Sequence, residues 1–119
     1  MAHIDQISFI KEFKDFYINN HFNKDIDILE IGSLDVNGNM RNLFDFCKSY
    51  TGIDLEEGPN VDLVLNGTDI HKLNKKFDII ISCECFEHAK DWKIIFERMC
   101  QISKPNSFVV ISVASTGRV

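Results

Sequence analysis

The chain has 119 residues, of which 45% are hydrophobic, and carries a net charge of −5 with a pI near 5.2. This length supports one domain, whose core buries about 65% of the surface that the unfolded chain exposes. The acidic charge argues against nucleic acid as the main partner. No apolar run approaches the ~20 residues of a membrane span and no charged-then-apolar leader opens the chain, so we expect a cytoplasmic protein without a membrane anchor.

The chain contains four cysteines: Cys47, Cys83, Cys85 and Cys100. They form no CxxC pair and lack the spacing of a zinc finger. We therefore expect reduced, mostly buried thiols, with disulfides or structural zinc as the alternatives.

Three stretches carry apolar residues at helical spacing, which predicts amphipathic helices over residues 5–20, 39–48 and 91–103. Asp5 and Asp91 are suited to cap the first and the last of them. Residues 70–76 predict at most one further helical turn. These helical stretches alternate with five apolar runs that read as strands.

The predicted strands cover residues 26–31, 50–54, 61–65, 77–83 and 108–113. The fourth is almost wholly apolar, which is typical of a central parallel strand covered on both faces. The alternation predicts an α/β fold: a Rossmann-like, open, mainly parallel sheet of about five strands with flanking helices.

The first predicted strand ends in an acid and continues into a glycine loop, at Glu30 and Gly32. A strand, a tight loop and a helix start are the unit with which α/β proteins bind the polar part of a nucleotide-like ligand. The dinucleotide fingerprint G-x-G-x-x-G is incomplete, because the next glycine is Gly38. A carboxylate also suits an ammonium group better than a pyrophosphate. The alternative is that Glu30 only caps the loop.

Two further acids follow predicted strands. Asp54 occupies the place where α/β sites bind ribose hydroxyls, and Asp69 is suited to accept from an exocyclic amine. An exposed turn and the N-cap of a short helix are the respective alternatives. Because the carboxyl ends of parallel strands meet at one edge, Glu30, Asp54 and Asp69 should lie at the same edge.

A fourth cluster, residues 82–88, follows the central strand. We expect Cys83 and Glu84 to face the ligand and His88 to reach a bound acceptor as a general base. A histidine that fixes a helix start is the alternative for His88. Metal binding is a further alternative, but Glu84 and His88 do not make the HExxH arrangement.

In order, these segments resemble the class I S-adenosylmethionine-dependent methyltransferases over residues 26–113. Residues 28–32 resemble the first motif, 50–54 the second-strand acid motif and 66–70 the adenine loop. Residues 77–88 resemble the fourth-strand motif, and 104–107 the turn before the fifth strand. The resemblance implies a single domain over residues 1–119 that binds S-adenosylmethionine.

The cofactor-binding residues that the resemblance implies are Glu30, Gly32, Ser33, Asp35, Asp54, Leu55, Asp69, Ile70, Cys83 and Glu84. Glu30 and the glycine loop would lie near the methionine moiety, and Asp54 would bind the ribose hydroxyls. Asp69 and Ile70 would lie at adenine, and Cys83 near the sulfonium.

Two features depart from the family pattern. The usual E-x-G-x-G-x-G keeps only its first glycine, although Asn37 and Gly38 restore flexibility. The sequence also stops after its fifth strand, whereas the family fold has seven. An apolar last strand leaves unpaired backbone at a sheet edge, which predicts a homodimer through this edge or the helix face beside it. A truncated form that retains the cofactor half is the rival explanation.

The sequence therefore predicts an S-adenosylmethionine-dependent methyltransferase that acts on a small-molecule or saccharide acceptor, mostly by positioning the reactants. One alternative is a non-catalytic module or regulatory subunit that binds S-adenosylmethionine or S-adenosylhomocysteine. The other, a nicotinamide-dependent oxidoreductase, is disfavoured by the incomplete fingerprint.

Overall fold

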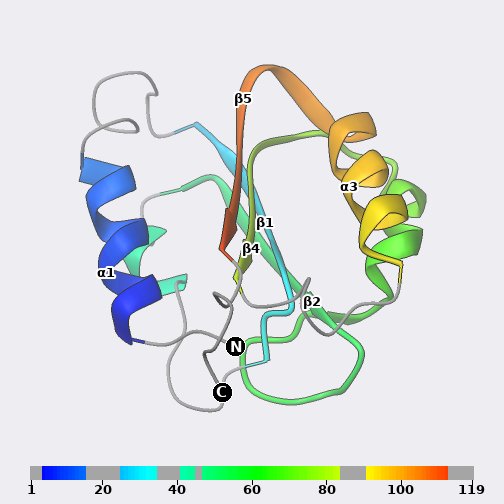
Figure 1. Cartoon of the computed structure of the whole chain (residues 1–119), viewed down its shortest axis with the longest axis horizontal. Coiled ribbons are helices and arrows are strands. Elements are labelled where there is room, and N and C mark those ends of the chain that lie inside the picture. The colour runs from blue at the N-terminus through cyan, green and yellow to red at the C-terminus, as the bar shows by residue number, and fades with distance from the viewer. Residues whose placement is uncertain (1–3, 16–24, 35–40, 45–46, 84–90, 113–119) are drawn as a thin grey trace.

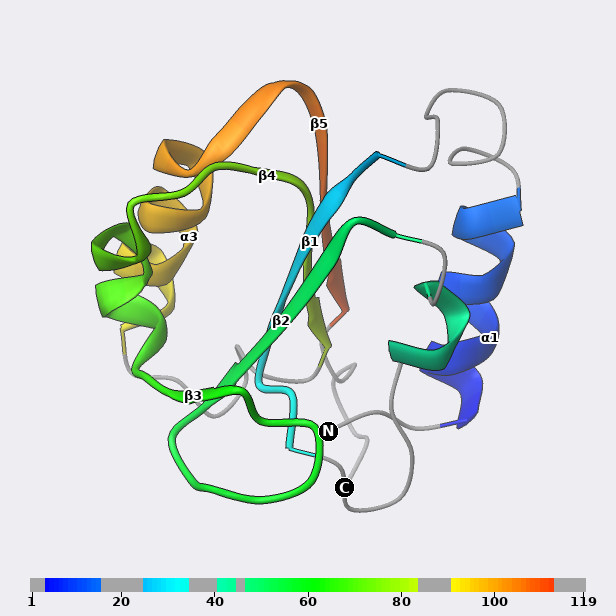
Figure 2. The same ribbon diagram turned by 180° about the vertical axis from the view of Figure 1, so that it is seen from behind.

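The computed structural model describes residues 4–15, 25–34, 41–44, 47–83 and 91–112. A parallel sheet of order β3-β2-β1-β4-β5 lies between two helical layers (Figure 1). The strands are β1 (Asp27–Ile31), β2 (Ser49–Asp54), β3 (Leu63–Val64), β4 (Phe77–Cys83) and β5 (Ser103–Ser112). Helices α1 (Ile4–Phe13) and η2 (Arg41–Phe44) cover one face, and η3 (Gly67–Leu73) and α3 (Trp92–Gln101) cover the other (Figure 2). The predicted fold class is confirmed.

The core lies on both faces of β1, whose five residues are all buried. Successive side chains of a strand point to opposite faces, so β1 contributes to two apolar clusters. The cluster on the α1 face contains Ile10, Ile26, Ile28, Phe44, Ile79, Ile81 and Val110. The cluster on the α3 face contains Leu29, Ile31, Ile53, Ile70, Phe77, Ile80, Ile95, Met99 and Ile102. Burial on both faces explains the apolar runs of β1 and β4.

The third strand is shorter than predicted and the helix after it is longer. β3 has only two residues, both exposed. Asp62 before it is also bound to β2, since its N–H donates to the carbonyl of Gly52 (2.8 Å). The helix η3 starts at Gly67, where Asn66 is the N-cap and accepts from the N–H of Thr68 (3.0 Å). The alternative that Asp69 caps this helix is therefore wrong.

Other bounds differ as well. The first helix is α-helical to Phe13, and of the predicted helix over 39–48 the structure describes the 3-10 turn η2 and Cys47–Lys48. Asp91 precedes α3 as predicted, but its side chain makes no capping hydrogen bond. β5 begins at Ser103, which pairs with Phe77, and its register shifts before Phe108 pairs with Ile79.

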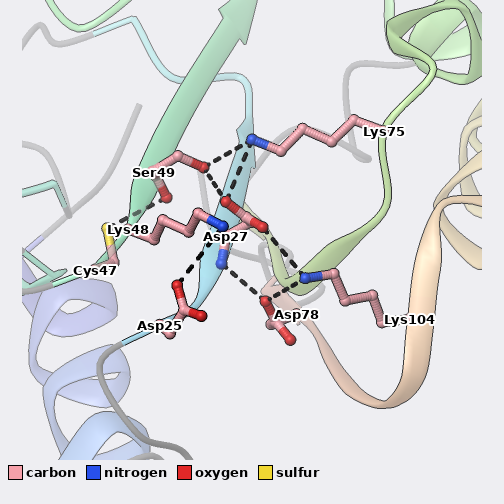
Figure 3. A network of polar contacts seen from close by, with 8 residues as sticks. All are labelled: Asp25, Asp27, Cys47, Lys48, Ser49, Lys75, Asp78 and Lys104. Carbon is pink, nitrogen blue, oxygen red and sulfur yellow. Dashed lines mark hydrogen bonds and ion pairs between the residues drawn. The ribbon is translucent and has the colours of Figure 1, made fainter.

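A charged group joins four strands at their amino ends (Figure 3). We call it the basal cluster; it consists of Asp27, Ser49, Lys75, Asp78 and Lys104. The carboxylate of Asp27 accepts from Ser49 Oγ (2.6 Å) and from Lys104 Nζ (3.2 Å), and it pairs with Lys75 Nζ (3.3 Å). Lys104 Nζ also donates to Asp78 Oδ2 (3.0 Å). Burial raises the pKa of Asp27, but the hydrogen bonds from Ser49, Lys104 and Lys75 outweigh it and lower this pKa to about 2. Asp27 is therefore ionised at neutral pH.

No helix in the described ranges is long and apolar enough to cross a membrane. Cys47 and Cys100 are free thiols. Cys47 is half-buried and donates to the carbonyl of Ser49 (3.2 Å), whereas Cys100 is exposed on α3. The prediction of mostly buried thiols is wrong for Cys100. The side chain of Cys83 and all of Cys85 lie outside the described residues.

Candidate functional site

The carboxyl ends of β1, β2 and β4 meet at one edge of the sheet, because Ile31 pairs with both Ile53 and Ser82. Of the predicted site residues, this edge carries Glu30, Gly32, Ser33, Asp54 and Leu55. Cys83 ends β4 there too, although its side chain is not described. Asp35, Glu84 and His88 lie outside the described residues.

The loop after β1, which we call the Gly32 loop (residues 32–34), is bound to the end of β2. The N–H groups of Gly32 and Ser33 both donate to the carbonyl of Ile53 (2.9 Å each). The N–H of Leu34 donates to Asp54 Oδ2 (3.0 Å). Gly32 has a φ of 77°, a conformation that favours glycine over any residue with a Cβ. The loop therefore depends on its one glycine and on Asp54.

Asp54 retains capacity to accept hydrogen bonds from a ligand. Its Oδ1 accepts from the N–H of Glu56 (3.3 Å) and its Oδ2 from Leu34, whereas a carboxylate has about four acceptor sites. The next residue, Leu55, leaves 67% of its surface exposed. The end of β2 thus offers an acceptor for hydroxyls beside an exposed apolar side chain.

Glu30 is buried, with 2% of its surface exposed. Its Oε1 accepts from the hydroxyl of Tyr50 (2.7 Å) and from Nδ2 of Asn60 (3.2 Å). Burial raises the pKa of Glu30 above its usual range, and the two hydrogen bonds oppose this shift. The described partners of the Glu30 carboxyl are thus Tyr50 and Asn60, and its predicted contact with a cofactor stays a prediction.

Sequence reasoning missed two polar residues that border this edge. Asn60 donates to the carbonyl of Ser33 (3.0 Å) and accepts from Arg41 Nε (2.6 Å). Arg41 also pairs with Asp62 and lies over the ring of Tyr50, 4.9 Å from its centroid. Asn60 is in a left-handed turn with a φ of 70°. The turn signal around it was visible in the sequence, but the direction of its side chain was not.

The predicted adenine residues belong to η3. Ile70 is fully buried in the cluster on the α3 face, so only its backbone is available to a ligand. Asp69 is partly exposed and pairs with Lys72 (3.4 Å). In the described part of the chain, no group of three or more His, Cys, Asp or Glu side chains is placed to bind a metal ion.

Residues 2–118 match the family model of the methyltransferase domain. The chain belongs to this family. The resemblance found in the sequence is thereby confirmed, and the carboxyl edge described above is the place where open α/β sheets bind ligands.

A solved methyltransferase shows the same fold. MycE, the methyltransferase from the mycinamycin biosynthetic pathway, was solved in complex with Mg and SAH and aligns with a TM-score of 0.58. The two sequences are 21% identical, and the alignment covers 98% of this chain but only 36% of MycE. At this identity the likeness establishes the fold. No curated protein matches the sequence significantly.

The residues of this methyltransferase domain fit the cofactor that the family resemblance implies, S-adenosylmethionine. The hydroxyl oxygens of Ser33 and Ser82 are buried at the edge and have no hydrogen-bond partner within the described structure. Buried polar groups without partners are uncommon, and a ligand with donors and acceptors would satisfy them. Together with the free capacity of Asp54, these hydroxyls give the edge hydrogen-bonding groups that suit a polar cofactor.

Proposed function

We propose that this domain binds S-adenosylmethionine at the carboxyl edge and transfers its methyl group to a small-molecule or saccharide acceptor. One observation carries the proposal: Asp54 both receives the N–H of Leu34 from the Gly32 loop (3.0 Å) and keeps acceptor sites for ribose hydroxyls. The methyltransferase family match and the MycE fold support it.

The cofactor supplies a methyl group on a positively charged sulfur. When bound, it would give this methyl group to a lone pair of the acceptor, and its sulfur would be left as a neutral thioether. We assign the ribose hydroxyls to Asp54, the exposed apolar contact to Leu55 and the polar end of the cofactor to the region of Glu30 and Ser33. We assign the acceptor's proton to His88, which lies outside the described residues. Most of the rate enhancement then comes from alignment.

The acceptor class rests on coarser support. MycE is a methyltransferase of the mycinamycin biosynthetic pathway, and this chain spans only 36% of the length of MycE. A small-molecule acceptor is therefore the proposal, with saccharides as one class.

The test is calorimetric titration of the purified chain with S-adenosylmethionine and, separately, with S-adenosylhomocysteine. We expect micromolar dissociation constants, followed by formation of S-adenosylhomocysteine with a pool of small-molecule and saccharide acceptors. Binding without turnover would favour a non-catalytic cofactor-binding module instead. Absence of binding to both compounds would refute the proposal.

We further propose that the domain is a cytoplasmic homodimer through the edge of β5, with the acidic charge supporting that location. In the described ladder β5 pairs only with β4, and its Phe108, Val109 and Ile111 are half-buried. Unpaired backbone on an apolar edge strand favours pairing with a second copy. Light scattering should give twice the chain mass of 13.7 kDa. A mass of 13.7 kDa at every concentration would contradict the dimer.

A further inference from the structure

The turn before β3 hydrogen-bonds to the Gly32 loop through the side chain of Asn60. Asn60 Nδ2 donates to the carbonyl of Ser33 (3.0 Å) and to Glu30 Oε1 (3.2 Å), while its Oδ1 accepts from Arg41 Nε (2.6 Å). Ser33 and Arg41 lie on either side of residues 34–40. One amide therefore contacts the chain both before and after that segment.

The position of Asn60 is itself fixed from three directions. Its backbone has a φ of 70°, which asparagine tolerates better than most residues. Its carbonyl oxygen lies over Gly52, so closely that a Cβ on that glycine would overlap it. Asp62, two residues later, accepts from the N–H of Gly52 (2.7 Å) and pairs with Arg41. The side chain is thus presented to the loop by a turn that is bound to β2.

The chemistry of the amide matches its three partners. The carbonyl of Ser33 and the carboxyl oxygen of Glu30 need donors, and the guanidinium of Arg41 needs an acceptor. An asparagine satisfies all of them at once. An aspartate of almost the same shape has no donor, so it would face two oxygens without a hydrogen bond.

We propose that Asn60 is a positioning residue of the cofactor site, which sets the place of the Gly32 loop by hydrogen bonding to Ser33, Glu30 and Arg41. This inference rests on the proposed function for its effect on binding, but not for its effect on the loop. Asn60 touches no reacting atom. It acts by holding the Gly32 loop in the position in which Asp54 and Ser33 can both contact the cofactor.

Two variants separate the amide from the backbone turn. Asn60→Gly keeps the left-handed conformation and removes the amide, and Asn60→Asp keeps the shape and removes the donors. The matched control is Asn74→Gly, because Asn74 also has a positive φ (52°) but lies at the C-cap of η3. All chains are compared at a temperature where thermal melting shows each of them fully folded.

Two readouts are used. Amide hydrogen exchange of peptides covering residues 29–41 should become at least tenfold faster in Asn60→Gly and Asn60→Asp and stay within twofold in Asn74→Gly. Calorimetry with S-adenosylhomocysteine should show at least tenfold weaker binding for the two Asn60 variants, a loss of about 1.4 kcal/mol in binding free energy. The affinity of the control should equal that of the wild type. Unchanged exchange in both Asn60 variants would overturn the inference.

The outcomes distinguish the two proposals. If the wild-type chain does not bind S-adenosylhomocysteine, the proposed function fails and hydrogen exchange alone decides the role of Asn60. If exchange rises but affinity does not change, the loop position is irrelevant to the cofactor and the positioning role is refuted. If Asn60→Asp behaves like the wild type while Asn60→Gly does not, the donors are not what matters, and the inference is refuted too.

Discussion

Asp54 is the residue that we propose binds the ribose hydroxyls of the cofactor. Asn at this position retains one acceptor for the N–H of Leu34 but loses the charge that strengthens bonds from ribose hydroxyls. We expect Asp54→Asn to weaken S-adenosylhomocysteine binding about tenfold to a hundredfold, corresponding to the 1.5–3 kcal/mol of a charged hydrogen bond. Calorimetry measures this, with Glu56→Gln as the control because that side chain is exposed. Equal affinities for wild type and Asp54→Asn would contradict the ribose role.

Glu30 gives opposite predictions for stability and for binding. Because its pKa is raised in the folded chain, its contribution to stability is largest at low pH and is lost as pH rises above about 4.5. Gln keeps an oxygen for Tyr50 and Asn60 without the buried charge. Glu30→Gln should therefore unfold at higher urea concentration than the wild type at pH 7, with little difference at pH 4.

The same variant tests whether the charge of Glu30 matters to the cofactor. An ammonium group near Glu30 would lose its counter-charge, so Glu30→Gln should bind S-adenosylmethionine more weakly at pH 7 while being more stable. A higher free energy of unfolding with an unchanged affinity for S-adenosylmethionine would show that Glu30 has only a structural role. The pair of urea and calorimetric measurements thus separates the two functions of one carboxyl.

At the scale of elements, Gly52 is the point where β2 meets two loops. A Cβ there would lie 2.6 Å from Ser33 Oγ and overlap the backbone oxygen of Asn60, which belongs to a bound turn. We expect Gly52→Ala to destabilise the chain by about 1–3 kcal/mol, as overpacking does, and to displace the Gly32 loop. Urea unfolding measures the loss.

Gly58→Ala is the matched control, because its Cβ would meet only the flexible end of Leu34. That side chain can rotate away, so we expect a cost below about 1 kcal/mol. If the two alanines destabilise equally, the contact of Gly52 with the loops is not what limits this position.

The strand and helix alternation let the sequence predict the order of the elements and most of their bounds. The apolar runs gave β1 and β4 nearly to the residue, since both are buried on two faces. The bounds of β3 and η3 were predicted less well. The pairing of β3 with β2 is a tertiary contact that no local pattern fixes, and Asn66, which reads as a turn residue, caps η3 by accepting from the N–H of Thr68. The role proposed for Asn60 could not be predicted, because its three partners come from distant parts of the chain.

For the molecule as a whole, the basal cluster makes the free energy of unfolding fall at low pH. The pKa of Asp27 falls from 3.8 to about 2 on folding, so its contribution is complete above about pH 4 and is lost as pH falls towards 2. We expect Asp27→Asn to cost about 2 kcal/mol at pH 7 and to flatten the dependence of stability on pH between 4 and 2. Urea unfolding at a series of pH values measures both.

Asp25→Asn is the control, because it removes the neighbouring ion pair with Lys48, whose side chains are 70% and 63% exposed. Exposed pairs contribute little, so we expect a change below about 0.5 kcal/mol at every pH. A loss for Asp27→Asn no larger than this would show that burial of the cluster adds nothing.

The strand order has a consequence for the way the chain folds. The central strand β1 pairs on one side with β2, which follows soon after it, but on the other side with β4, so that Ile28 lies opposite Ile79. The backbone hydrogen bonds between β1 and β4 therefore cannot form until β4, which is synthesised much later, has left the ribosome. Contacts between distant residues slow folding, since long loops must close before the ladder forms. In a nascent chain that ends before β4 is complete, at Cys83, one side of the central strand is not fully paired. At this stage the chain is most prone to aggregate.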